Sequence, residues 1–67
     1  MISYTPLWKT LLDHRMKKQD LQSLIECSSA TIAAMSKDKY VSLSIIDRIC
    51  EKLDCRIEDV IEYVHTS

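Results

Sequence analysis

The sequence contains no glycine among its 67 residues. Tight turns between helices usually place one residue at positive φ, where a side chain costs about 1 kcal/mol or more. A residue with a side chain must therefore take this conformation, and we expect it first at Glu26 and next at Arg15. The absence also excludes a glycine-rich loop of the kind that binds phosphates.

Long apolar runs are absent as well. The longest spans only a few residues, far short of the roughly 20 that cross a bilayer. Residues 1–8 lack the basic start and the apolar stretch of a signal peptide. We therefore expect a cytoplasmic protein that makes no contact with membranes.

Patterns that support catalysis or metal binding are missing too. The three cysteines, Cys27, Cys50 and Cys55, include no C-x-x-C pair and match no metal-ligand spacing. In a reducing cytosol they are most simply small apolar groups, and two of them fall on predicted inner faces of helices. No Ser–His–Asp set or catalytic carboxylate pair is recognisable. We expect no metal, no cofactor, no small-molecule substrate and no enzymatic activity.

Charge is present in both signs and is unevenly distributed. The net charge is −1, which by itself speaks weakly against nucleic acid as a partner. Residues 1–40 carry a net +2, however, and residues 41–67 a net −3. The hydrophobic fraction of 46% and the length of 67 residues predict a single globular domain with a small core over residues 1–67.

Helical periodicity covers most of the chain. Apolar residues recur at steps of three and four in five segments. Each segment starts at a capping residue, at a proline or where the periodicity begins. The starts are near Thr5, Lys18, Ser28, Ser42 and Ile57. The pattern predicts an all-α fold, a compact five-helix bundle. The inward-facing residues of the last helix would be Ile57, Val60, Ile61 and Val64.

The two ends of the chain mix β-branched and aromatic residues, which favour extended structure. Residues 2–4 and residues 63–65 are the segments concerned. Two arrangements are compatible with this composition. The segments pair as a small two-stranded ribbon, or one of them adds to a second subunit.

Residues 18–36 have the spacing of two short helices joined by a three-residue turn. Ser28 is a good N-cap for the second of them, which would span about residues 28–36. This layout is typical of a helix-turn-helix, whose second helix enters the DNA major groove. The inner faces carry Leu21, Leu24 and Ile25 in the first helix and Ile32 and Met35 in the second.

The chain resembles the Cro/C1-type (Xre-like) helix-turn-helix family, and in particular its small stand-alone members. The resemblance rests on the apolar spacing of residues 21–35, on Ser28 followed by Thr31-Ile32, and on residues 49–55 leading into residues 57–60. It covers essentially the whole chain. It implies a lambda-repressor-like DNA-binding domain that docks its third helix in the major groove of double-stranded DNA.

The resemblance also implies a site. Residues of the third helix would face the edges of the bases: Ser29, Ala30, Ala33 and Ala34. Residues at the start of the second helix and in the loop after the third would lie on phosphates: Lys18, Gln19, Lys37, Lys39 and Tyr40.

Three positions depart from the family pattern. Glu26 stands where the turn glycine is usual, and Lys17 stands where a capping Ser or Thr is usual. The outer face of the third helix carries no Arg, Lys, Asn or Gln before Lys37. Because those side chains make the bidentate contacts that distinguish bases, we expect little sequence discrimination from this helix.

Two functions are compatible with these features. The preferred one is a bacterial or phage-type transcriptional regulator that binds double-stranded DNA. One such domain would bind a half-site weakly, so a homodimer or a second DNA-binding partner is expected, with Ile61, Tyr63 and Val64 as the candidate dimer surface. The alternative is a helix-turn-helix-shaped module that binds another protein, which the net acidity and the alanine-lined helix favour.

Overall fold

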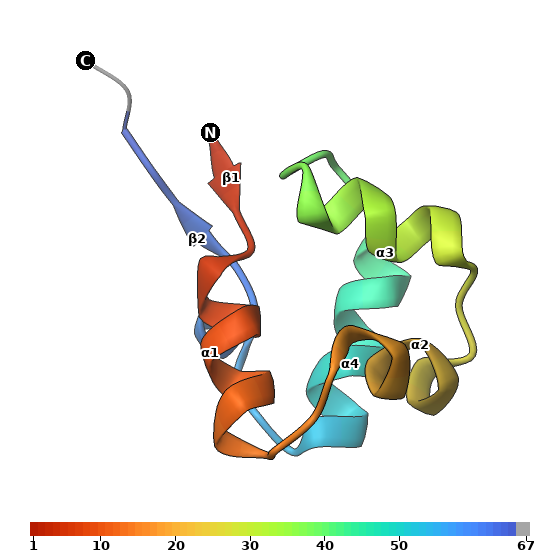
Figure 1. The fold of residues 1–67 in the computed structure, drawn as a ribbon. Helices are drawn as coiled ribbons and strands as arrows, with labels where there is room; N and C mark the ends of the chain where they lie inside the picture. Colours follow the sequence, from red (N-terminus) through yellow and green to blue (C-terminus); the bar gives the residue numbers. More distant parts are fainter. Residues whose placement is uncertain (66–67) are drawn as a thin grey trace.

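The computed structural model describes residues 1–65, so that the last two residues of the expected domain lie outside the described part. It is mostly helical, and both described ends of the chain lie on the same side of the molecule (Figure 1). The elements in chain order are β1 (Ile2–Ser3), α1 (Thr5–Asp13), α2 (Lys18–Ile25), α3 (Ser29–Ser36), α4 (Leu43–Leu53), the 3₁₀ turn η1 (Ile57–Asp59) and β2 (Glu62–Tyr63).

The predicted count of five α-helices is wrong, because the described residues form four. The segment expected to be the fifth helix contains only the turn η1, after which the chain extends into β2. There Glu62 pairs with Ser3 and Tyr63 with Ile2 in an antiparallel ladder. The backbone groups that would have closed a longer helix are used in this ladder instead. The prediction of a ribbon between the two ends is thereby confirmed.

One apolar core joins all four helices and Val60, the residue that follows η1. Leu7 and Met35 are completely buried, as is Val60 just after η1. Three residues that we expected on inner faces lie outside this core: Leu24 is 36% exposed, Val64 39% and Ile57 52%. The buried apolar residues are Tyr4, Leu7, Leu11, Leu21, Ile25, Ile32, Met35, Ile46, Ile49, Leu53 and Val60.

Four residues with side chains adopt positive φ: Arg15, Glu26, Asp38 and Asp54. The predictions for Glu26, with φ 54°, and for Arg15, with φ 56°, are confirmed. Asp54 ends α4 and Asp38 lies in the loop after α3. Aspartate is one of the few residues other than glycine that adopt the left-handed region readily. A chain without glycine thus makes its helix ends with whichever side chains stand there.

Among residues 1–65, no helix is long and apolar enough to cross a membrane. The same residues contain no group of three or more His, Cys, Asp or Glu side chains placed to hold a metal ion.

Candidate nucleic-acid interface

The helices α2 and α3 are joined by a short, well-defined turn. Glu26 ends α2 in the left-handed conformation, and its N–H donates to the carbonyl of Gln22. Ser28 then caps α3, since its hydroxyl accepts a 3.2 Å hydrogen bond from the N–H of Thr31. The predicted N-cap is therefore confirmed. The helix α3 begins at Ser29 and ends at Ser36, close to the boundaries expected for the second helix of this pair.

The helix α3 has one buried side and one open side. Ile32 and Met35 pack into the core beside α2 and α4. Ser29, Ala30 and Ala33 are exposed on the other side. Ala34 is only half-exposed, because it stands nearer to the buried side of the helix. The open surface is consequently small and smooth, with Ser29 as its main polar group.

The loop between α3 and α4 carries the cationic part of the candidate site. Lys37 and Lys39 are exposed on either side of Asp38. Tyr40 is 80% exposed, so its ring does not fill a gap between helices. The amide of Lys39 donates to the carbonyl of Ala34 at 2.9 Å, which folds the start of the loop back onto the end of α3.

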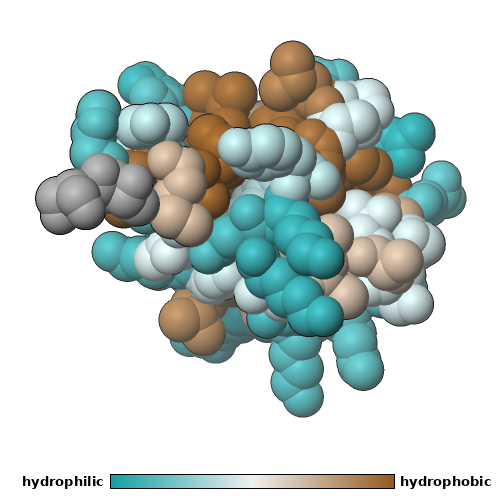
Figure 2. Space-filling view, turned by 90° about the horizontal axis from the view of Figure 1, so that it is seen from above, coloured by the Kyte–Doolittle hydropathy of each residue, from teal (hydrophilic) through white to brown (hydrophobic). Residues whose placement is uncertain are grey.

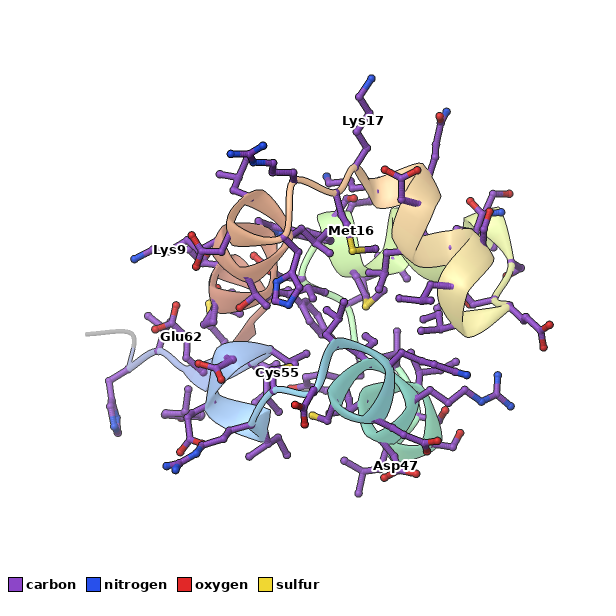
Figure 3. The ribbon with its side chains drawn as sticks, turned by 90° about the horizontal axis from the view of Figure 1, so that it is seen from below. Lys9, Met16, Lys17, Asp47, Cys55 and Glu62 are labelled. Atoms are coloured by element: carbon purple, nitrogen blue, oxygen red, sulfur yellow. The ribbon has the colours of Figure 1, made fainter. Side chains whose placement is uncertain are left out.

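The start of α2 supplies the other part of the candidate site. Gln19 is exposed and Lys17 extends away from the protein (Figure 3). No Ser or Thr caps this helix; instead the carboxylate of Asp20 accepts a 2.8 Å hydrogen bond from the N–H of Lys17. This bond satisfies one backbone donor at the helix start and places a negative charge where the helix dipole favours it.

Lys18 is held by contacts that the sequence did not reveal. Its ammonium lies 4.4 Å from the centre of the Trp8 ring and donates a 2.9 Å hydrogen bond to the Ser36 hydroxyl. That hydroxyl in turn donates to the carbonyl of Ile32 at 3.0 Å. Lys18 therefore joins α1, the start of α2 and the end of α3. No local signal identified Ser36 or Trp8 as partners, because both lie ten or more residues from Lys18.

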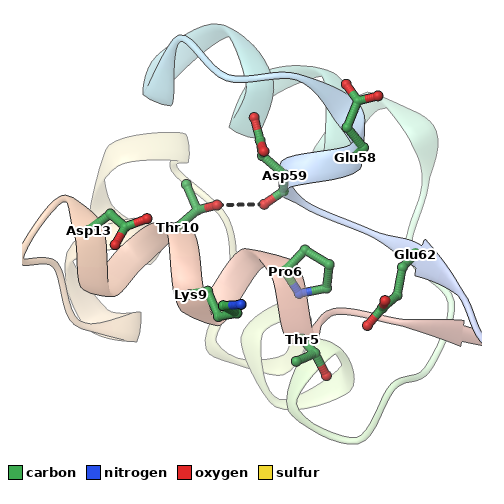
Figure 4. A pocket seen from close by; sticks show the side chains of 8 residues that line it. All are labelled: Thr5, Pro6, Lys9, Thr10, Asp13, Glu58, Asp59 and Glu62. Atoms are coloured by element: carbon green, nitrogen blue, oxygen red, sulfur yellow. Dashed lines mark hydrogen bonds between the residues drawn. The ribbon is translucent and has the colours of Figure 1, made fainter.

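Two other surface features lie away from α3. A groove of about 350 Å³ runs between α1 and η1 and is mainly acidic (Figure 4). The Thr10 hydroxyl crosses it and donates to the carbonyl of Asp59 at 2.7 Å. We assign no function to the groove. Its lining residues are Thr5, Pro6, Lys9, Thr10, Asp13, Glu58, Asp59 and Glu62.

The second feature is an apolar surface at the end of the molecule that carries the ribbon of β1 and β2, where a group of hydrophobic side chains is visible from above (Figure 2). Met1 is 53% exposed and Tyr63 is 63% exposed there. Of the candidate dimer residues, Ile61 packs partly against the core, whereas Tyr63 and Val64 remain exposed. Two shallow grooves at this end are lined by Met1, Ile2, Tyr4, Asp38, Lys39, Tyr40, Val41, Leu43, Ile46 and Ile61.

The three cysteines are free thiols, each partly buried. Burial, with Cys50 and Asp59 nearby, raises the pKa of the Cys55 thiol to about 11. Burial also raises the pKa of Cys27. Because the thiolate is the reactive form, neither group is activated as a nucleophile.

The order and packing of α2 and α3, capped by Ser28 and open on one side, define a helix-turn-helix protein. A family model described as a Cro/C1-type HTH DNA-binding domain matches residues 6–66. The chain therefore belongs to the Cro/C1-type helix-turn-helix family of DNA-binding domains.

A solved structure supports this assignment. The chain is similar to the transcriptional regulator VanUg, in a crystal structure of its form II, with 43% sequence identity and a TM-score of 0.88. The match covers 91% of this chain and 81% of the VanUg chain. A search of curated proteins gave no match.

Proposed function

We propose that this protein regulates transcription by placing α3 in the major groove of double-stranded DNA. The observation that carries the proposal is the open side of α3, with exposed lysines on the loop that follows it. Family membership and the likeness to a transcriptional regulator support the same function. Ser29, Ala30 and Ala33 would face the bases, with Ala34 at the margin of the contact.

The phosphate contacts would come from the loop after α3 and from the start of α2. Lys37, Lys39 and Tyr40 are exposed in the loop, Lys18 and Gln19 are exposed at the helix start, and the bond to Ser36 brings Lys18 to the end of α3. The ammonium of Lys18 has three N–H donors, of which Ser36 takes one. Its remaining donors are free to bind a phosphate oxygen while the contact with the protein is kept. Such contacts fix the position of α3 on the duplex without reading its sequence.

The test is fluorescence anisotropy of a labelled duplex at 50 and 200 mM salt. Three lysines on phosphates give a slope of log affinity against log salt of about −3 per bound copy. We therefore expect binding about 40-fold weaker at the higher salt. A duplex that does not bind even at 50 mM salt would contradict the proposal and favour the protein-binding module instead.

We propose further that the functional unit is a homodimer, because a smooth α3 surface with Ser29 as its main polar group offers little affinity for a single half-site. Tyr63 and Val64 remain the candidate contact, next to the exposed Met1. Sedimentation equilibrium of the native chain and of Val64→Glu tests this. A native chain that stays monomeric at the concentrations where it binds DNA would contradict it.

A further inference from the structure

Tyr4 makes two hydrogen bonds to the loop that carries the candidate phosphate contacts. Its N–H donates to the Asp38 carboxylate at 3.1 Å, and its hydroxyl donates to the carbonyl of Lys39 at 2.8 Å. The ring of Tyr4 is only 2% exposed. The segment between β1 and α1 is thereby fixed to a loop more than 30 residues further along the chain.

These bonds add to the backbone hydrogen bonds that already tie the start of the loop to the carbonyls of Ala34 and Met35 in α3. Asp38 has φ 55°, and Lys39 and Tyr40 belong to no helix or strand. Both lysines of the loop project into solvent. A buried ring with its hydroxyl on the Lys39 carbonyl fixes the backbone from which these cations extend. Without the Tyr4 hydroxyl, only the start of the loop would be held by α3, and the backbone after Lys39 would have to be ordered when DNA binds, at the expense of affinity.

The charge of Asp38 has a structural use of its own. A carboxylate between two lysines opposes the approach of phosphate, so its presence in the loop reduces the electrostatic attraction. Here the carboxylate stands at the start of α1, where it accepts from Tyr4, the N-cap residue. The helix dipole favours a negative charge at that place. Asp38 thus connects the loop to the first helix.

We propose that Tyr4 and Asp38 are positioning residues for DNA binding, which hold the loop so that Lys37 and Lys39 reach the phosphates together. This rests on the proposed function, because it takes both lysines to be phosphate contacts. Tyr4 itself does not touch DNA in this arrangement.

Two substitutions of Asp38 separate its positioning role from its charge. Asp38→Asn keeps an oxygen acceptor and tolerates positive φ, but removes the charge; we expect its affinity for DNA to equal or exceed that of the native protein. Asp38→Ala removes the same charge together with the acceptor, and we expect affinity about fivefold lower. If electrostatics alone mattered, both variants would bind more tightly by the same factor.

Tyr4→Phe provides an independent test, because it removes only the hydroxyl bonded to Lys39 and keeps the backbone N–H that donates to the Asp38 carboxylate. We expect affinity about fivefold lower and a salt slope that is smaller in magnitude by about 1 to 2. The matched control is Thr10→Val, which deletes another hydroxyl-to-carbonyl hydrogen bond, on the far groove. Thr10→Val lowers the melting temperature but leaves affinity and slope unchanged in titrations well below that temperature.

The outcomes distinguish this inference from the proposed function. Native protein that does not bind DNA overturns both. Native protein that binds with a steep salt dependence, while Tyr4→Phe and Asp38→Ala retain its affinity and slope, overturns the positioning role alone. A loss in Thr10→Val equal to that in Tyr4→Phe also overturns it, because general destabilisation would then explain both.

Discussion

The ammonium of Lys18 lies 4.4 Å from the centre of the Trp8 ring, which brings the start of α2 against α1. The same group bonds to Ser36 at the end of α3. Lys18 therefore links the two helices of the helix-turn-helix to the first helix of the bundle. Such a contact gives an exposed lysine a structural role in addition to the proposed contact with phosphate.

Replacing Lys18 by methionine keeps the apolar stem and removes the cation. We expect the free energy of unfolding to fall by about 0.5–1 kcal/mol, the range for exposed cation–π pairs. The fluorescence of Trp8, the sole tryptophan, should change as well. The control is Lys17→Met, because Lys17 extends away from the protein. Equal unfolding energies and emission spectra for the two variants would contradict the role of Lys18.

Replacing Lys37 by alanine should weaken binding by a similar factor on every DNA sequence, since phosphates carry no sequence information. The magnitude of the salt slope should decrease by about 0.9. Lys9→Ala removes the same charge from the groove beside η1, and we expect a smaller change in affinity and no change in slope. A slope unaffected by Lys37→Ala would show that Lys37 does not lie on a phosphate.

A negative charge on the open side of α3 should prevent close approach to DNA. Ala33→Glu places it there with a good helix former, so that the fold is retained. We expect affinity at least tenfold lower in anisotropy titrations. Ile57→Glu adds the same charge at η1, where Ile57 is 52% exposed, and should have a much smaller effect. Equal losses in both variants would indicate a response to net charge rather than to the α3 surface.

Glycine at position 26 should relieve the left-handed turn. Glu26 has φ 54°, and glycine occupies this region without steric cost. We expect Glu26→Gly to raise the free energy of unfolding by about 0.5–1 kcal/mol in urea denaturation. Glu26→Ala removes the same charge but keeps a Cβ atom, and should not stabilise the protein. An equal gain in both variants would assign the effect to charge.

Alkaline pH should destabilise the fold. The pKa of Cys55 is raised to about 11 and that of Tyr4 is also raised, in both cases chiefly by burial. The folded state therefore holds these protons more tightly than the unfolded state. Stability is complete below about pH 9 and falls as pH rises towards 11. In Cys55→Ala, the free energy of unfolding measured with urea should depend less on pH over this range. An unchanged pH dependence would contradict the assignment.

Much of the helix-turn-helix could be predicted from the sequence because its signals are local. Ser28 caps the helix that starts one residue later, and the spacing of Leu21, Ile25, Ile32 and Met35 identifies the buried faces. The strain at Glu26 follows from a turn that has no glycine. All these signals act within one or two helical turns, where residues close in the sequence are also close in space.

The expected fifth helix shows where local pattern is insufficient. The spacing of Ile57, Val60, Ile61 and Val64 fits a helix, yet the chain extends at Glu62–Tyr63. Pairing with β1, some 60 residues away in sequence, decided between the two conformations. Leu24 likewise fits the spacing of an inner face, but it is 36% exposed and lies outside the core.

The sequence by itself determined the class of fold, the place of the recognition helix and the surface charges beside it. These depend on periodicity, capping and side-chain chemistry, which are properties of neighbouring residues. Only the tertiary structure decided that Lys18 rests on Trp8 and that Tyr4 holds the loop of Lys39. Those contacts join segments far apart in the chain, and they form only after the core has brought the helices together.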